Sequence, residues 1–534
     1  MRLTIYAVLL FALLMPLQSF ADDLGLVRLS LTEGEVQVLV QNSTDWTDAA
    51  INLPLNEGDR LWVPDDGKAE LQIRGGVYVR ANNNTSLDML TVDKDSAQLY
   101  LDQGHVYINN RRGGIKIVQV DTPLSSVRSY DNSIMLVDVS EDGVTEVSVL
   151  KGYAYAENRA GSTRVSAGNT LTIRSDNSAD IAPIATPDDW EQWNTDRDRR
   201  LTAWGESSRY LPDELHEYST DFDENGRWEY AGTYGYVWAP TVVAAGWAPY
   251  TVGRWIWIRG HYVWVAYDPW SWAPSHYGRW VYLSNSWCWV PPPIGSVYWG
   301  PGYVGWLVTP TYVAWVPLAP GEIYYGYGYY GPGSVNINTV NVRTIIVNRT
   351  YINARAANSV TIEHRESFGT GRRVLMPAKE NPFIDTQHHS TNITIVPPPV
   401  KPLQPIVLVP SEEQGRERHQ IPDRERIRLV TPEKRHEVAP AIPSPTPAVK
   451  KREYPIASPP AATPGPAAVQ QLHPRLLPPK RVRDTRPEEM KNERRLVKDR
   501  ESSVFKQEAP EHLNVNRSNE PKKIIRKWAP YQDK

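Results

Sequence analysis

Apolar and polar residues alternate in short segments throughout residues 24–181. Segments such as "GEVQVLV", "KAELQIR" and "SIMLVDV" place every second residue on one face, which is the period of a half-buried strand. Gly, Asn and Asp separate the segments at intervals of about ten residues, and none of the segments has a helical period. The pattern predicts a mainly β protein with an N-terminal antiparallel β sandwich, barrel or β-helix-like domain.

One segment after these strands has the period of a helix. Pro187, Asp188 and Asp189 stand at its start, where a proline and acidic residues favour helix initiation. The side chains that recur on one face of this helix are Trp190, Trp193, Arg197, Leu201 and Trp204. We therefore expect one short helix within a connector over residues 187–215, packed through this face onto the neighbouring domain.

The tripeptide Gly-Arg-Trp occurs three times, beginning at Gly226, Gly253 and Gly278. Each copy opens a strand with two aromatic residues two positions apart, and a turn and a second such pair follow. The pairs are Trp228 and Tyr230 with Tyr236 and Trp238, Trp255 and Trp257 with Tyr262 and Trp264, and Trp280 and Tyr282 with Trp287 and Trp289. A hairpin cannot bury such a face alone, so we expect stacked β-hairpin repeats over residues 216–376, ending in Asn/Val-rich strands. The arginine of each copy lies on the opposite face, where it can pair with a carboxylate or lie on a neighbouring ring.

Tryptophan is more abundant here than the hairpins require, since 14 of the 20 tryptophans fall between Trp228 and Trp315. The surplus stands beside prolines or glycines in connections and comprises Trp247, Trp270, Trp272, Trp299 and Trp306. Two interpretations are open for these rings. Either they are core, because a short repeat needs large side chains to form one, or they stack on a sugar or a proline-rich peptide. We take the five as candidate ligand-stacking residues.

The N-terminus has the pattern of a cleavable signal peptide over residues 1–21. Arg2 precedes an apolar run from Leu3 to Leu17, and Ser19-Phe20-Ala21 offers small residues to a signal peptidase. The run is shorter than the roughly 20 apolar residues that span a membrane, and no later stretch is as long. The mature chain is expected to be periplasmic or secreted, without a transmembrane segment.

Prolines and basic residues crowd the C-terminal part, for example in "VPPPVKPLQPIVLVP" and "YPIASPPAATPGPAA". Residues 401–534 hold 28 Lys+Arg and 18 Asp+Glu, a net charge of +10, whereas the first 400 residues carry −13. Such a composition buries too little apolar surface to offset its ordering entropy, so residues 397–534 are predicted to be a disordered Pro-rich tail. Residues 401–534 would be suited to electrostatic association with an anionic envelope surface, and nucleic acid is not expected as a partner.

The order of the N-terminal segments resembles the FecR-type periplasmic domain. The motifs that carry the likeness are Gly58-Asp59, Val120-Asp121-Thr122-Pro123 and Val147-Ser148-Val149-Leu150-Lys151-Gly152. One departure is Tyr130-Asp131-Asn132-Ser133, where the family usually has a Gly-Thr pair. Family regulators join such a domain to a cytoplasmic anti-sigma segment through one membrane helix, and neither part is expected here. The resemblance therefore implies the fold and an extracytoplasmic binding role, but not transcriptional signalling.

The region after the helix also resembles a known domain. The segments "GWAPYTVGRWIW", "DPWSWAPSHYGRWVY" and "YVAWVPLAPGE" are similar to a Trp- and Pro-rich domain of uncharacterised function, which follows FecR-type domains in secreted bacterial proteins. The likeness continues into the Asn/Val-rich strands. No activity or catalytic residue comes with this resemblance.

A search for enzyme motifs finds no paired-His zinc motif, nucleophile elbow or phosphate-binding Gly loop. His388-His389 stands in a polar stretch, where adjacent histidines are usually solvated, and His261 and His276 lie among tryptophans. Cys288 is the only cysteine, so no internal disulfide can form, and its apolar neighbours predict a buried, inert thiol. We therefore predict no catalytic residue, no metal site and no cofactor.

These patterns together predict a non-enzymatic extracytoplasmic binding or scaffold protein that engages glycan or other envelope components. Its partner would be an envelope protein or a polysaccharide. Two alternatives stay open: a sensory partner in FecR-like envelope signalling, and a glycan-active enzyme with an unrecognised site.

Overall fold

The structure, a computed structural model, describes residues 26–111, 113, 115–202, 205–338, 351–370, 373–376, 381–384, 394 and 396–398. The predicted signal peptide, the predicted tail beyond residue 398, Trp204 and the histidine pair at 388–389 lie outside the described residues. Strands dominate the part of the chain that is described, so the mainly β prediction is confirmed.

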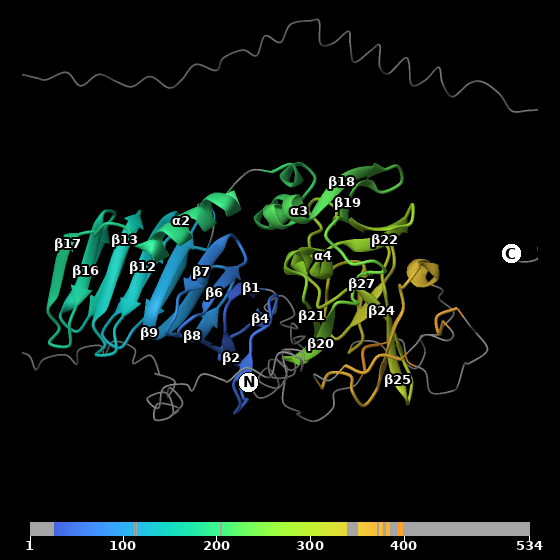
Figure 1. The fold of residues 1–534 in the computed structure, drawn as a ribbon, viewed down its shortest axis with the longest axis horizontal. Helices are drawn as coiled ribbons and strands as arrows, with labels where there is room; N and C mark the ends of the chain where they lie inside the picture. Colours follow the sequence, from blue (N-terminus) through green and yellow to red (C-terminus); the bar gives the residue numbers. More distant parts are fainter. Residues whose placement is uncertain are drawn as a thin grey trace, which may run out of the picture. The chain divides into compact units, whose positions relative to one another are not determined.

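Strands β1–β17 form the N-terminal domain (Figure 1). Their pairings give one sheet in the order β4-β1-β6-β7-β9-β12-β13-β16-β17 and a second in the order β3-β2-β5-β8-β9-β10-β11-β14-β15. Among these described strands, only β9 and β10 pair in parallel. Alternate apolar residues of both sheets belong to one buried cluster, so the domain is the sandwich that the alternation predicts. The strands are β1 (Val27–Glu33), β2 (Gln37–Leu39), β3 (Thr47–Asp48), β4 (Pro54–Leu55), β5 (Arg60–Val63), β6 (Lys68–Ile73), β7 (Val77–Ala81), β8 (Thr85–Val92), β9 (Ser96–Asn110), β10 (Ile117–Asp121), β11 (Ser126–Tyr130), β12 (Ser133–Val139), β13 (Thr145–Lys151), β14 (Tyr153–Asn158), β15 (Gly161–Ser166), β16 (Asn169–Ile173) and β17 (Ala179–Pro183).

Strand β9 joins the two sheets at Gly104. The segment before Gly104 pairs with β8 and β10 in one sheet, and the segment from Gly104 onward pairs with β7 and β12 in the other. Gly104 has φ +102°, and a Cβ there would lie 2.4 Å from the Thr85 hydroxyl oxygen. Glycine is therefore required at this position, because it combines a left-handed backbone with a close approach.

Residues 130–133, the departure from the FecR pattern, form the turn that takes the chain from β11 in one sheet to β12 in the other. Asn132 in this turn has φ +62°. Asparagine tolerates this backbone better than most residues, because its short polar side chain can hydrogen-bond locally. The departure is therefore compatible with the sandwich.

Helix α2 (Asp189–Thr202) begins where the sequence predicts. The Asp188 carboxylate accepts a hydrogen bond from the Glu191 backbone N–H at 2.8 Å, and the Glu191 carboxylate accepts one from the Asp188 N–H at 3.1 Å. This reciprocal pair satisfies two backbone donors at the start of the helix. Three short helices follow, where one helix was expected: η2 (Ser207–Arg209), η3 (Asp213–Tyr218) and α3 (Ser219–Asn225).

The predicted aromatic face of α2 packs on the first sheet. Trp190 and Trp193 stack with their ring centroids 5.2 Å apart. They contact Tyr107 of β9 and Leu136 of β12, which belong to a cluster separate from the core of the sandwich. The prediction that this face clamps the helix onto the neighbouring domain is confirmed.

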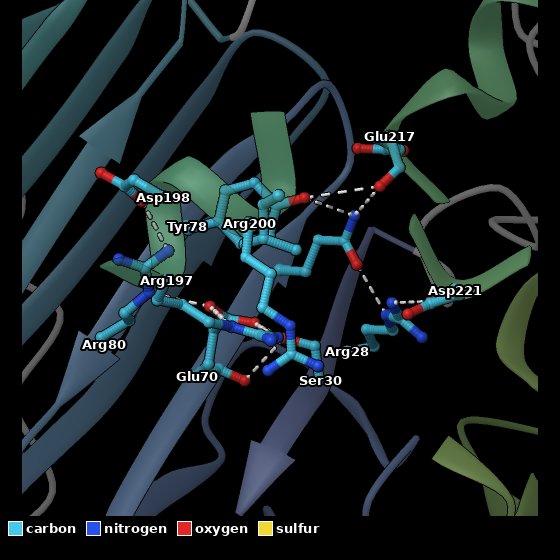
Figure 2. Close-up of polar contacts among 12 residues, drawn as sticks. Arg28, Ser30, Glu70, Tyr78, Arg80, Arg197, Asp198, Arg200, Glu217 and Asp221 are labelled. Atoms are coloured by element: carbon cyan, nitrogen blue, oxygen red, sulfur yellow. Dashed lines mark hydrogen bonds and ion pairs between the residues drawn. The ribbon is translucent and has the colours of Figure 1, made fainter. Parts of the chain in front are cut away.

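A buried network of charges also joins α2 to the sheet (Figure 2). Glu70 of β6 accepts hydrogen bonds from Arg80 of β7 and from Arg197 of α2, each at 2.8 Å. Arg80 also contacts Asp198 at 2.6 Å, and the side chains of Glu70 and Arg80 are fully buried. Burial alone would raise the pKa of Glu70, but the hydrogen bond and charge of Arg197 and the charge of Arg80 lower it to about 2. Glu70 is therefore ionised at neutral pH and paired with two cations, as a buried charge must be paired.

A second polar junction, also visible in Figure 2, is centred on Arg28 of β1. The buried Arg28 guanidinium donates to Asn52 at 3.1 Å and to Asp221 of α3 at 2.8 Å. The Asn52 amide in turn donates to the backbone carbonyls of Ala266 at 3.2 Å and Asp268 at 2.9 Å. Hydrogen bonds at this point thus connect the sandwich with the connector and with the domain that follows.

The three predicted hairpins are confirmed, and the described residues contain a fourth that was not predicted. Strand β19 also pairs with β23, through Trp238 and Trp289, so β18 is an edge strand in a sheet of order β18-β19-β23-β22. The hairpins are β18 (Gly226–Ala231) with β19 (Gly235–Pro240), β20 (Gly253–Ile258) with β21 (His261–Ala266), β22 (Arg279–Leu283) with β23 (Ser286–Val290), and β24 (Val304–Val308) with β25 (Tyr312–Pro317). The remaining elements are η4 (Pro269–Ser271), α4 (Trp272–His276), β26 (Tyr324–Gly326), β27 (Ser334–Asn336), η6 (Ile352–Arg355) and β28 (Thr361–His364), which pairs with β25.

Each of these four hairpins holds two tryptophans directly opposite each other on its two strands. The pairs are Trp228 with Trp238, Trp255 with Trp264, Trp280 with Trp289, and Trp306 with Trp315. In the Gly-Arg-Trp repeats the second tryptophan packs against the bare Cα of the glycine. A Cβ on Gly226 would lie 2.3 Å from the Trp238 ring, and one on Gly253 would lie 2.7 Å from the Trp264 ring. The glycine of the motif is therefore required by the tryptophan across the strand.

The arginines of the three repeats lie in different surroundings. The Arg254 guanidinium is buried, donates to the Tyr267 hydroxyl and lies 5.4 Å from that ring centroid. The Arg279 guanidinium lies 3.7 Å from the centroid of the Tyr303 ring. The prediction that these arginines lie on neighbouring rings is confirmed for these two, whereas Arg227 on the edge strand is 59% exposed.

Replacing Gly226 by Ala should destabilise the hairpin domain by roughly 1–3 kcal/mol, because the new methyl group overpacks against Trp238. The backbone at Gly226 is extended, at φ −165°, so the substitution tests the steric contact alone. Gly232→Ala is the matched control, since a Cβ there meets nothing within 4 Å. Urea unfolding of the two variants compares them, and equal midpoints would show that the contact does not require glycine.

Glu70→Gln should destabilise the chain by about 3–5 kcal/mol, because Arg197 loses the carboxylate that it contacts and the buried Arg80 keeps only Asp198. Glu224→Gln is the control, since Glu224 forms an exposed pair with Arg200 and should contribute less than about 1 kcal/mol. Urea unfolding measures both, and a loss at Glu224 as large as that at Glu70 would contradict the buried network.

The same variant predicts a pH dependence. The pKa of Glu70 is lower in the folded chain, about 2, than its ordinary value of 4.5, so its contribution is complete above about pH 4.5 and is lost as the pH falls toward 2. Over that window the wild-type chain should lose more unfolding free energy than Glu70→Gln does. Unfolding free energies of the two chains that fall by the same amount over this pH range would contradict the low pKa of Glu70.

Candidate functional site

A cavity of about 380 Å³ lies in the hairpin domain, between the end of β19 and the turn that joins β22 to β23. Aromatic and polar side chains share its wall with small apolar ones. The aromatic residues are Trp247, Tyr282 and Trp287, and the polar ones are Arg227, Asn285, Ser286 and Asn358. The remaining wall is formed by Ala239, Pro240, Val243, Ala244, Gly246 and Ala357.

The cavity exists because β19 and β23 pair at only one position, Trp238 with Trp289. Beyond that pair, β19 ends at Pro240, which has no N–H with which to continue a ladder. The strands can therefore diverge on the side of Pro240 and Trp287, and both residues line the cavity. The opening is thus a consequence of how the sequence terminates β19.

Two connections place the aromatic rings around the cavity. The β22–β23 turn has positive φ at Ser284 (+47°) and Asn285 (+67°). A two-residue hairpin turn needs such angles to match the twist of the strands that it joins. Its register sets Tyr282 opposite Trp287, with their ring centroids 5.2 Å apart. The cavity therefore receives a ring from each strand of this hairpin.

Trp247 comes from the connection that follows β19. Its ring centroid is 5.6 Å from that of Trp270 and 5.6 Å from that of Trp280, and its indole N–H donates to Asp268 at 3.1 Å. These contacts fix the ring, while the side chain stays partly exposed at the cavity wall. The Asn358 amide donates to the Gly246 carbonyl at 3.1 Å and holds the connection in place.

The polar groups of the wall are mostly hydrogen-bond donors. The Tyr282 hydroxyl donates to the Asn285 side-chain oxygen at 2.9 Å, which leaves the Asn285 amide nitrogen without a partner among the described residues. The Arg227 guanidinium lies 3.8 Å from the Glu229 carboxylate, and both side chains are exposed. No carboxylate is among the residues that line the cavity. The cavity thus offers flat rings together with amide, hydroxyl and guanidinium donors.

Of the five tryptophans predicted to stack on a ligand, the structure places only Trp247 at this cavity. The other four are buried, each at most 3% exposed, as the core interpretation has it and the ligand-stacking one does not: Trp270, Trp272, Trp299 and Trp306. The physical reason is that their connections pack as core elements. Trp270 belongs to η4 and packs against Trp238 and Trp247. Trp306 is the cross-strand partner of Trp315 in the fourth hairpin.

Trp272 and Trp299 surround His276, whose ring stacks on Trp299 with centroids 5.2 Å apart. Burial lowers the pKa of His276 to about 4, and burial does the same for His261. Both imidazoles are therefore neutral at physiological pH, and each is hydrogen-bonded within the core, to Gly300 and Tyr330 respectively.

The residues that sequence reasoning missed are Arg227, Tyr282, Asn285 and Trp287. Tyr282 and Trp287 belong to the predicted ring pairs. Trp287 is 5% exposed, so it belongs to the core as well as to the cavity wall, and Tyr282 is partly exposed. Their position next to the turn is the signal that was available, because the turn lines the cavity. Nothing in the sequence distinguishes Arg227 from the other two repeat arginines.

Cys288 is buried, as predicted, and its thiol donates to Glu229 at 3.3 Å. Burial, together with this carboxylate, raises the pKa of the thiol to about 12, so it is protonated at neutral pH. Within the ranges that the structure covers, no group of three or more His, Cys, Asp or Glu residues could hold a metal ion. The helices of these ranges are all too short or too polar to cross a membrane.

Two family models match the chain. Residues 59–155 match the FecR protein family, and residues 219–322 match a family of unknown function (DUF6600). No curated protein matches the chain.

Similar solved structures include two of a protein assigned as an anti-sigma factor from Parabacteroides distasonis ATCC 8503, at 1.65 Å and 2.50 Å resolution. In each comparison the identity is 15% and the TM-score is 0.22, with 23% of this chain and 59% of that chain covered. The chain therefore spans about three fifths of the length of these structures, and a likeness of this size supports no conclusion about function.

The FecR match confirms the resemblance carried by the Gly58-Asp59, Val120–Pro123 and Val147–Gly152 motifs, and it supports an extracytoplasmic role in envelope signalling. The second match confirms the resemblance of the tryptophan-rich segments and includes most of the cavity wall. The chain thus carries a FecR domain at residues 59–155 and a DUF6600 domain at residues 219–322.

Proposed function

We propose that this chain is a non-enzymatic extracytoplasmic binding protein whose hairpin domain holds a glycan of the cell envelope. The observation that carries the proposal is the cavity lined by Trp247, Tyr282 and Trp287, with the exposed Arg227 and the Asn285 amide nitrogen beside them. Its volume falls in the range of about 300–1,000 Å³ typical of small-ligand sites.

Sugar rings suit such a wall because one face of a saturated ring is apolar while its edges carry hydroxyl groups. An indole or phenol ring contributes apolar area at low entropy cost, and nearby amides and hydroxyls bind the ring's edge. The Trp247 ring is held by Trp270 and Trp280 before any ligand arrives. A site that is already ordered loses little entropy on binding, which favours affinity.

Binding is favoured over sugar hydrolysis at this cavity by the chemistry of its wall. Glycoside hydrolysis generally uses two carboxylic acids that flank the bond to be broken. The lining residues supply rings, amides, a hydroxyl and a guanidinium, and no Asp or Glu is among them.

A second candidate function is that of a sensory partner in envelope signalling, which the FecR match favours. In that role the glycan would be the signal, and the hairpin domain would report it to the sandwich. The Asn52 and Arg28 hydrogen bonds would be the contacts through which the two domains influence each other.

A glycan array probed with the full-length mature protein tests the proposal, and Trp247→Ala sharpens it. The variant should lose about 1–3 kcal/mol of binding free energy, by analogy with other ring-stacking sites. Tyr230→Ala is the matched control, because Tyr230 is a 70% exposed ring of the same sheet outside the cavity wall. Each variant is also melted, so that lost binding is scored only on folded protein.

The proposal requires that the array binds, that Trp247→Ala weakens this binding and that Tyr230→Ala does not. An array without bound glycan would contradict it. Binding that persists in folded Trp247→Ala but fails in Tyr230→Ala would move the site to the exposed edge of the sheet.

A further inference from the structure

We infer that the glycan held in the cavity is acidic, and that Arg227 binds the carboxylate of a uronic-acid residue. The inference rests on the proposed function and specifies the ligand class of the same site.

Arg227 differs from the two arginines that occupy the same place in the other repeats. Arg254 is covered by Tyr267, and Arg279 by Tyr303, so their guanidinium groups are engaged inside the domain. Arg227 is 59% exposed, and its side chain is at the cavity wall. The sequence therefore repeats an arginine three times and leaves this one available to a ligand.

The carboxylate of Glu229 does not neutralise Arg227 effectively. The closest atoms of the pair are 3.8 Å apart, and the two side chains are 59% and 40% exposed. An exposed pair at this distance contributes little, because water screens both charges. Glu229 also accepts the hydrogen bond of the Cys288 thiol through its other oxygen. A ligand carboxylate could therefore bind both arms of the guanidinium at once, which is the geometry that arginine favours.

The rest of the wall complements an anion as well. The Asn285 amide nitrogen is available because its oxygen already accepts the Tyr282 hydroxyl. Ser286 adds a hydroxyl, and no lining residue carries a negative charge. A neutral sugar offers the guanidinium no opposite charge, whereas a uronate ring presents an apolar face to Trp247 and a carboxylate to Arg227.

Net charge alone does not draw an acidic polymer to the cavity. The first 400 residues carry −13 and residues 401–534 carry +10, so the whole chain is at −3. A uronate that binds at the cavity must then depend on the few donors of its wall. Removal of the single charge at Arg227 should have a large effect for this reason, and removal of another exposed arginine should not.

The test uses full-length mature protein and three uronate oligosaccharides: oligogalacturonate, oligoglucuronate and oligomannuronate. Each is compared by calorimetry with the neutral oligosaccharide of the same linkage. At least one uronate should bind about tenfold or more tightly than its neutral counterpart, and Arg227→Gln should abolish that preference. Arg227→Lys should restore part of it, because lysine keeps the charge but not the two-armed geometry.

Arg209→Gln is the control variant, since Arg209 is exposed, carries the same charge and does not line the cavity. It should keep the preference for uronate, and melting curves should show that all variants remain folded. A short acidic peptide serves as the competing ligand class.

Equal binding of uronate and neutral sugars would overturn the inference and leave the proposed function standing. A preference for uronate that survives Arg227→Gln would also overturn it, by showing that the anion binds elsewhere. Binding of the acidic peptide alone, or of none of these ligands, would overturn both the inference and the proposed glycan function.

Discussion

The hairpin domain depends on one repeated contact, the packing of a tryptophan against a bare glycine Cα across two strands. The contact joins Gly226 to Trp238 and Gly253 to Trp264, and a similar approach of 2.8 Å separates a Cβ on Gly278 from the Trp289 indole nitrogen. The ring occupies the space that a side chain at the glycine would need. Short hairpins of a few residues per strand can therefore build a core, and most of the domain's tryptophans are consumed in doing so.

In the sandwich, buried ion pairs fix the position of helix α2 on the sheet. The outer face of this sheet must hold α2 in one register. Glu70 and Arg80 pair with each other within the sheet, and Arg197 and Asp198 of the helix reach Glu70 and Arg80 only when the helix is in place. Buried ion pairs add little stability compared with apolar packing, since desolvation offsets much of their attraction. Their value here is specificity, because a slipped helix would leave at least one charge buried and unpaired.

What the sequence predicts follows from how local each signal is. The start of α2 at Asp188 and the three Gly-Arg-Trp hairpins depend on neighbours in the sequence, and all were predicted. The burial of Trp272 depends on packing between elements, so the sequence leaves its ring open to ligand stacking. The burial of Arg80 is equally non-local, because nothing in the neighbouring sequence indicates that a helix covers it. The fourth hairpin was predictable, since Trp306 and Trp315 have the nine-residue spacing of Trp255 and Trp264.

The candidate site depends on how the surroundings of the three repeat arginines differ. All three repeat arginines stand on edge strands, since β18 and β22 end one sheet and β20 belongs to a two-stranded sheet. Tyr267 covers Arg254 and Tyr303 covers Arg279, whereas Arg227 is 59% exposed. The adjoining strand ends at Pro240 and opens the cavity beside it. The same motif therefore gives two arginines that lie on rings and one that is exposed beside the cavity, where a ligand can reach a tryptophan ring and a guanidinium together.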